Sequence, residues 1–329
     1  MRLPAFAFLS VLAFAGAAQA APVYGSMAGA SLGQGASLNG AVPFPATNAW
    51  NTNISTLPVD PNSANILATI SIDNGLHPDF GAGYYQGASI GIPYYVVAGT
   101  QPKVKVHFTA YGDQSDPGGY RIPPNAEIEG FTKSGKPAVG DRHVLVIDRD
   151  HNNLYELWHA FLQTDGSWKA GSGAIFHLNS NDVRPTAKPG WTSADAAGLP
   201  IFPGLVRYDE AHAGLIPHAL RFTVDNTREA YTAPANHWAS DDTNPNLPPM
   251  GMRVRLKASY VIPSSYSAET KTILQALKTY GMIVADNGSN WFISGAPDSR
   301  WDNDALVGEL RNVTRGNFEV VKMGKIVTP

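Results

Sequence analysis

Short apolar or alternating runs, separated by turns rich in Gly, Pro, Asn and Asp, organise this chain. Residues 104–108 alternate between apolar and polar side chains, which is the two-residue period of a half-buried strand. Residues 142–148 and 154–161 flank a polar turn and predict a β-hairpin. Further strands are predicted at 66–72, 91–97, 218–224, 252–260 and 318–321. The series predicts a mainly β fold.

The last 65 residues, 265–329, have a different pattern. Residues 268–280 show helical spacing of apolar side chains, and Ser267 is a suitable N-cap. Asp302 is placed to cap a second, short helix. Residues 283–285 and 291–293 flank an Asp-Asn-Gly-Ser turn and predict another hairpin. We therefore expect a small α/β element at the C-terminal end of the β body.

The N-terminal region divides into two segments. In the first, 1–20, Arg2 precedes an apolar run and Ala18-Gln19-Ala20 forms a small-x-small site, so we expect a signal peptide cleaved between Ala20 and Ala21. The protein would then be secreted, to the periplasm or the extracellular space. Residues 21–48 are rich in Gly, Ala and Ser and predict a flexible leader. Residues 49–329 are expected to form a single β-sandwich domain.

Composition narrows the function classes. Hydrophobic residues make up 43% and charged residues 16%, with 32 Gly and 25 Pro, which suits many turns between short strands. The net charge of −3 gives no reason to expect a nucleic-acid partner. The chain has no cysteine, which excludes thiol catalysis and thiolate metal sites. No long apolar segment follows the predicted signal peptide, so we expect no membrane insertion, and we expect a monomer.

The predicted hairpin carries the first candidate chemistry. Glu156 and Trp158 lie two residues apart and share one strand face. An indole can stack on the apolar face of a pyranose while a carboxylate accepts from hydroxyls or acts as acid or base. The alternative is a structural one, in which Glu156 pairs with a nearby Arg on a solvated face.

A second cluster falls on a Pro- and Gly-braced stretch, 190–222, which suits a preorganised site. Its polar and aromatic members are Trp191, Asp195, Arg207, Asp209, Glu210, His212, His218 and Arg221. Asp209 and Glu210 are adjacent and would point opposite ways, so either could pair with Glu156. Two carboxyl groups across one groove, about 5 Å or about 6.5–9.5 Å apart, perform glycoside hydrolysis. Structural salt bridges to Arg207 and Arg221 are the alternative.

A third feature is a row of basic residues. Arg253, Arg255 and Lys257 recur every second position and project from one strand face. Like charges in a row need anions opposite them, either the protein's own carboxylates or an acidic glycan. The second case would favour uronate lyase chemistry, but we prefer internal pairing.

Metal ligands are not indicated by spacing. The histidines His212, His218 and His237 match no compact metal motif, so we expect no metal cofactor. A calcium ion held by Asp241, Asp242 and Asn244 is a weak alternative.

Three stretches are distinctive: GWTSADAAGLPIFPGLVRYDE, LPPMGMRVRLKASY and LKTYGMIVADNGSNWFISGAPDSRWD. With them the chain, from about Trp50 to its end, resembles a widespread group of largely uncharacterised secreted bacterial and fungal proteins. The group is similar in general look to lectin- and glucanase-type β-sandwich proteins. The resemblance implies a jelly-roll-like sandwich and carries no catalytic residues.

We therefore expect a secreted glycoside hydrolase that acts on a polysaccharide or oligosaccharide. The catalytic candidates are Glu156, Asp209, Glu210 and His218. The substrate-binding candidates are Trp158, Trp191, Asp195, Arg207, Arg221, His237, Arg253, Arg255 and Lys257. A polysaccharide lyase and a non-catalytic glycan-binding surface protein are the alternatives.

Overall fold

The computed structural model describes residues 21–71, 75–132, 140–184 and 190–329. The predicted signal peptide lies outside the described residues. Strands make up 27% of the structure and helices 14%, so the predicted mainly β class is confirmed. In the described ranges no helix combines the length and the apolar character that crossing a bilayer requires.

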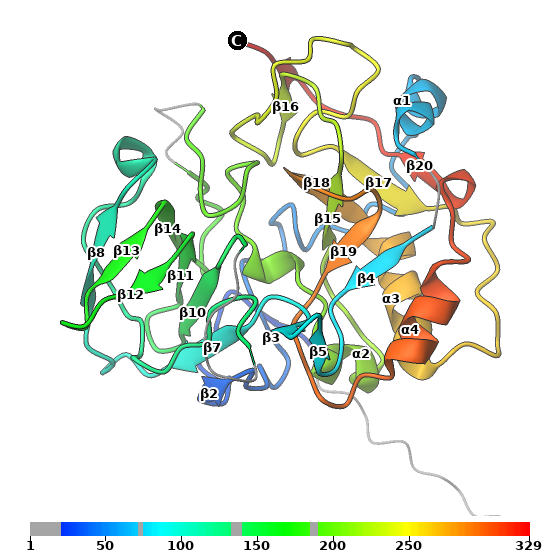
Figure 1. Ribbon diagram of the computed structural model, residues 1–329. Coiled ribbons are helices and arrows are strands. Elements are labelled where there is room, and N and C mark those ends of the chain that lie inside the picture. The colour runs from blue at the N-terminus through cyan, green and yellow to red at the C-terminus, as the bar shows by residue number, and fades with distance from the viewer. Residues whose placement is uncertain (1–20, 72–74, 133–139, 185–189) are drawn as a thin grey trace, which may run out of the picture.

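A five-stranded sheet contains the predicted hairpin (Figure 1). Its order is β14 (Ser172–His177), β11 (Asn153–Trp158), β10 (Val144–Asp148), β7 (Tyr94–Val97) and β2 (Gly33–Gln34). Strands β10 and β11 are antiparallel, and Leu145 lies opposite Glu156. The alternation of side chains across this pair is as the sequence predicted.

Both faces of the five-stranded sheet are buried. Leu145 and Ile147 point into the main core, whereas Val144 and Val146 pack against a four-stranded sheet. The order of the second sheet is β12 (Phe161–Leu162), β13 (Trp168–Ala170), β8 (Val104–Phe108) and β9 (Gly119–Tyr120). Cover on both sides explains why β10 reads as an unbroken apolar run.

A six-stranded sheet forms the other half of the molecule (Figure 1). Its order is β20 (Phe318–Val320), β17 (Arg253–Leu256), β18 (Met282–Asn287), β15 (Leu220–Val224), β19 (Phe292–Ser294) and β4 (His77–Asp79). Helices α3 (Ala268–Thr279) and α4 (Asn303–Leu310) cover its outer side. Both predicted caps form, since Ser267 accepts from the Thr270 N–H and Asp302 from the Ala305 N–H.

The short elements connect and close these sheets. They are β1 (Val23–Tyr24), β3 (Ala41–Val42), α1 (Ser63–Thr69), β5 (Tyr84–Tyr85), β6 (Ala88–Ser89), α2 (Tyr208–Ala213), β16 (Tyr231–Thr232) and β21 (Ile326–Val327), with 3-10 turns at Gly112–Gln114, Phe202–Gly204 and Arg315–Asn317.

Three predicted elements are wrong. Residues 66–69 of the strand expected at 66–72 belong to helix α1, because a short apolar run fits a buried helix turn as well as a strand. Residue 72 lies outside the described residues. The hairpin expected across Asp286–Ser289 does not form, because β15 lies between β18 and β19. The C-terminal segment is not an appended element, because it supplies three of the six strands of this sheet, β18, β19 and β20, together with both covering helices.

The predicted flexible leader is also wrong. Met27, Leu38 and Phe44 are at most 3% exposed and belong to the main core. Strand β2 forms one edge of the five-stranded sheet, and β1 pairs with β3. Glycines at positive φ, such as Gly25 and Gly40, let the chain turn tightly between these apolar anchors. The packed domain therefore includes residues 21–48.

The jelly-roll arrangement is not established by this topology. A jelly roll is an antiparallel architecture. Here β7 pairs with β10, β8 with β13, and β15 with β18 in parallel.

The packing of the N-terminal segment can be tested with two matched substitutions. Met27→Ala should lower the free energy of unfolding by about 2–5 kcal/mol, because it empties a fully buried site. Leu32→Ala, at a side chain that is 50% exposed, should change it by about 0.5 kcal/mol or less. Urea denaturation followed by tryptophan fluorescence measures both. Equal, small effects would show that the segment is detached.

Candidate functional site

Glu156 lies in the protein interior and not in a groove. Its side chain is fully buried, and its carboxyl oxygens accept hydrogen bonds from the Ile201 N–H at 3.0 Å and the Phe202 N–H at 2.9 Å. Burial raises its pKa to about 7, although these two bonds oppose the shift. Glu156 thus anchors a loop, and its predicted role as a catalytic carboxylate in contact with substrate is corrected.

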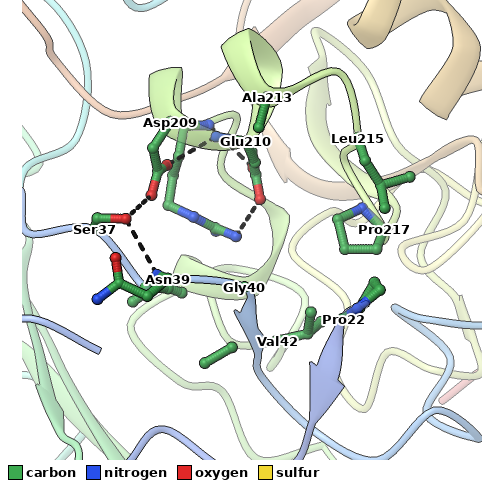
Figure 2. A pocket seen from close by; sticks show the side chains of 13 residues that line it. Pro22, Ser37, Asn39, Gly40, Val42, Asp209, Glu210, Ala213, Leu215 and Pro217 are labelled. Carbon is green, nitrogen blue, oxygen red and sulfur yellow. Dashed lines mark hydrogen bonds and ion pairs between the residues drawn. The ribbon is translucent and has the colours of Figure 1, made fainter. Parts of the chain in front are cut away.

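Asp209 and Glu210 lie in the first turn of helix α2 and line a cavity of about 410 Å³ (Figure 2). Figure 2 shows Asp209 next to Ser37, whose hydroxyl donates to it at 2.8 Å. Glu210 binds the Arg207 guanidinium at 2.5 Å and the His218 Nε2 at 3.1 Å. The other walls are mostly aliphatic: Pro22, Leu38, Ala41, Val42, Ala213, Leu215 and Pro217.

These contacts favour the salt-bridge alternative for this cluster. Glu156 is not among the residues that line this cavity, so neither Asp209 nor Glu210 faces it across a groove. His218 is 1% exposed, and its Nδ1 donates to the Ala219 carbonyl at 2.8 Å. Arg207 and His218 therefore hold Glu210 in place, and the predicted carboxylate pair with Glu156 is not formed.

The basic row is also used inside the protein. Arg253 donates to the carbonyls of Tyr280 and Ala49, both at 2.8 Å. Arg255 pairs with Glu319 at 2.7 Å, and Lys257 donates to the Gly316 carbonyl at 2.8 Å. Internal pairing holds as predicted, although only Arg255 has a carboxylate partner among these contacts.

A cluster of polar side chains surrounds Arg221, on β15. The sequence pattern grouped Asp195 with Arg221 but did not predict Asp286 or Ser294 as neighbours. Arg221 donates to both oxygens of Asp195, at 2.8 and 2.7 Å, and to Asp286 at 3.0 Å. It also donates to the Ser294 hydroxyl at 2.7 Å. The guanidinium is 5% exposed, so these partners replace its hydration almost completely.

Sheet register explains why these residues meet. Ser294 lies beside Asp79 on β4, and its hydroxyl reaches Arg221 on β15. A bulge follows the Phe222–Val284 pair, so that Thr223 lies opposite Asp286. The extra residue moves Asp286 onto the sheet face of Arg221, where an unbroken register would have turned it away.

Asp195 and Asp286 line a cleft of about 220 Å³, which we call the acidic cleft. The remaining lining residues are Tyr111, Asp141, Trp158, Ser172, Thr192, Ser193, Ala194, Ala196, His237, Ala239 and Asn287. Asp141 is exposed, and its Oδ1 accepts from the Trp158 indole N–H at 3.3 Å. The cleft therefore lies where one end of the five-stranded sheet meets β18, with an indole beside a carboxylate.

The carboxyl groups here are electrostatically perturbed. Burial and the Asp195 charge raise the pKa of Asp286 to about 7, against the opposing effect of Arg221. Burial and the Glu129 charge raise the pKa of Asp79, close by. Asp286 thus keeps its proton up to nearly neutral pH. Asp286 is therefore a carboxyl group of perturbed pKa in the lining of a cleft, which is typical of a functional site.

An ion pair between the buried His143 and the half-buried Glu129 supports the loop that carries Asp195. His143 Nδ1 lies 2.6 Å from Glu129, and its Nε2 lies 3.1 Å from the Ala194 carbonyl. Burial lowers the pKa of His143, but the Glu129 carboxylate outweighs it and raises that pKa to about 9. The charged imidazole can donate from both nitrogens, and so it fixes the loop that carries Asp195.

Of the predicted residues His237 and Trp191, only the first lies at the acidic cleft. His237 lines the acidic cleft, and its Nδ1–H donates to the Ala196 carbonyl at 2.7 Å. Burial lowers its pKa, so the neutral ring keeps Nε2 as an acceptor. Trp191 is not among the lining residues, and the Arg184 guanidinium lies 5.4 Å from its ring centre.

The structure therefore brings together Trp158, Asp195, Arg221 and His237 of the predicted site. Sequence reasoning missed Asp79, Glu129, Asp141, His143 and Asp286. Asp286 was assigned to a hairpin turn, and only the bulge shows where it points. In the described part of the chain no three His, Asp or Glu side chains are grouped so that they could hold a metal ion. The calcium candidates Asp241 and Asp242 therefore belong to no such group.

Comparison with known proteins adds no assignment. No protein-family model, no curated protein and no solved structure matches the chain. The resemblance to secreted lectin- and glucanase-type proteins therefore stays a prediction.

The buried Glu156 should make stability depend on pH. The pKa of Glu156 is about 7 in the folded protein, above the unfolded value of about 4.3. Its contribution to stability is therefore complete below about pH 4.3 and is lost as the pH rises through 7. Glu156→Gln should reduce the fall in unfolding free energy between about pH 5 and 7, by up to about 1.4 kcal/mol per pH unit.

Urea denaturation at several pH values measures this effect. Asp241→Asn, at an exposed carboxyl, is the matched control and should keep the wild-type slope. Asp286 leaves a residual slope in both variants, since its pKa is raised as well. An unchanged slope in Glu156→Gln would contradict the assignment.

Proposed function

We propose that the protein is a secreted glycoside hydrolase whose reaction takes place in the acidic cleft. The observation that carries the proposal is the presence of two unlike carboxyl groups, Asp286 and Asp141, in the lining of one cleft. Asp286 is largely buried and keeps its proton to about pH 7, whereas Asp141 is exposed. Environments that separate two carboxyl groups in this way divide the acid and base roles of glycoside hydrolysis.

Each carboxyl group has a defined part in this mechanism. Protonated Asp286 donates its proton to the glycosidic oxygen as the bond to the anomeric carbon breaks. Asp141 either attacks the anomeric carbon or takes a proton from the attacking water. The Asp141 Oδ1 also accepts a hydrogen bond from the Trp158 indole N–H, which holds the indole beside the reacting sugar. The sugar ring would be oriented by stacking on that indole.

Arg221 and Asp195 are positioning residues in this proposal. Arg221 fixes the Asp286 carboxyl at 3.0 Å, while the Asp195 charge helps to keep that carboxyl protonated. Neutral His237 offers Nε2 as an acceptor for a sugar hydroxyl. The cleft is thereby supplied with a donor, a base, an acceptor and an apolar platform.

The alternatives are distinguished by charge and by chemistry. A uronate lyase needs a cation to neutralise the substrate carboxylate. Among the described residues no arginine or lysine lines the cleft, and the nearby Arg221 is already paired with Asp195 and Asp286. The exposed Asp141 carboxylate would repel a uronate, so we favour a neutral glycan. A glycan-binding protein without activity would use the same platform but would not depend on Asp286.

Substitution of the two carboxyl groups tests the hydrolase. Asp286→Asn and Asp141→Asn should each lower kcat/KM by about 100- to 10,000-fold, because each removes an acid or base. Asp225→Asn, an exposed carboxyl at the end of β15, should retain wild-type activity. Reducing ends released from a panel of neutral polysaccharides measure all three.

The pH profile gives a second criterion. Wild-type kcat/KM should fall above about pH 7 as Asp286 loses its proton. Unsaturated-uronate absorbance without new reducing ends from neutral glycans would identify a lyase instead. Glycan binding with no product from any polysaccharide of the panel would exclude both enzymes and identify a non-catalytic glycan-binding protein.

A further inference from the structure

We infer that a row of sugar subsites extends out of the acidic cleft along Tyr111, Trp158, His159 and Phe161, which we call the aromatic row. This inference rests on the proposed function, because it assumes that the cleft binds a glycan. It adds that the substrate is a chain which continues past the cleft onto the four-stranded sheet.

The rings of the aromatic row follow one another closely. Their centres are 6.1 Å apart from Tyr111 to Trp158, 5.5 Å from Trp158 to His159, and 4.8 Å from His159 to Phe161. Tyr111 and Trp158 line the acidic cleft, whereas Phe161 belongs to β12 outside it. The row is thus continuous with the proposed reaction site.

The outer members of the row remain accessible. Tyr111 is 42% exposed and Phe161 is 38% exposed, so a ligand can reach both rings. The Arg142 guanidinium lies 4.0 Å from the Phe161 ring centre and supports that ring. A ring that is braced by a cation and still exposed is suited to stacking on a ligand.

The backbone fixes the direction of the row. Strand β11 ends at Trp158, and His159 adopts a left-handed φ of 53°, after which β12 begins at Phe161. The His159 N–H donates to the Asp141 carbonyl at 2.7 Å, so the turn is tied to the catalytic candidate. A Cβ at Gly171 would lie 2.3 Å from the Trp158 ring, so glycine leaves room for the indole.

A glycan fits these features better than a protein partner. The exposed faces of these rings can stack on the C–H faces of sugar units. His159 adds hydrogen-bonding capacity between apolar rings. The planes of successive rings are inclined to one another, by 49°, 37° and 87°, so a polymer bound in the cleft would turn as it passes from one ring to the next. Each ring it reaches adds a contact, and its affinity should therefore rise with chain length.

The experiment compares Phe161→Ala with Leu162→Ala in the full mature protein. Phe161→Ala should weaken binding of a long neutral oligosaccharide by about five- to tenfold, as expected for loss of one aromatic stacking contact. It should leave kcat/KM on a short chromogenic glycoside unchanged. Leu162, the next residue, is 43% exposed and not aromatic, so its variant should bind within about twofold of wild type.

Calorimetry with an oligosaccharide length series gives the affinities, and thermal unfolding checks that both variants are folded. Equal long-chain affinity in wild type and Phe161→Ala would overturn the aromatic row while hydrolysis stands. A loss of self-association in Phe161→Ala, with glycan affinity unchanged, would make the row a protein interface and also overturn it. Length-dependent binding without hydrolysis by wild type would refute only the proposed function.

Discussion

The buried guanidinium of Arg221 is the constraint on which the site depends. A charge that is nearly sealed from water must be paired, and breaking such a pair typically costs about 3–5 kcal/mol. Asp195 satisfies two of its N–H groups and comes from a loop, whereas Asp286 and Ser294 come from neighbouring strands. The cation therefore fixes the loop to the six-stranded sheet and sets the position of Asp286.

Glu156 performs the complementary task on the other sheet. It lies on β11 and accepts from the Ile201 and Phe202 N–H groups, a few residues after Asp195 in the same loop. Two buried ionisable side chains, one on each sheet, thus hold one loop between them. The acidic cleft lies where that loop crosses, which explains how a stretch without regular structure can present a precise set of polar groups.

The sequence predicted what local pattern controls. The period of two placed the β10–β11 hairpin, and the caps Ser267 and Asp302 placed both C-terminal helices. Composition misled at 21–48, because Gly-rich sequence is typical of flexible linkers but also of tight turns between buried apolar side chains. The predicted catalytic carboxylates failed for a similar reason, since spacing cannot show that Glu156 faces the interior.

The missing half of the site depends on long-range pairing. Asp286 reaches the cleft only because β18 pairs with β15, about 60 residues away in the chain, and because a bulge then shifts its face. Each neighbouring charge is neutralised in place, Arg221 by Asp195 and Glu129 by His143. What remains is Asp286, whose pKa is raised, and the exposed Asp141 beside an indole. The proposal of a neutral glycan as substrate rests on this pair, because such a ligand brings no opposing charge to the Asp141 carboxylate.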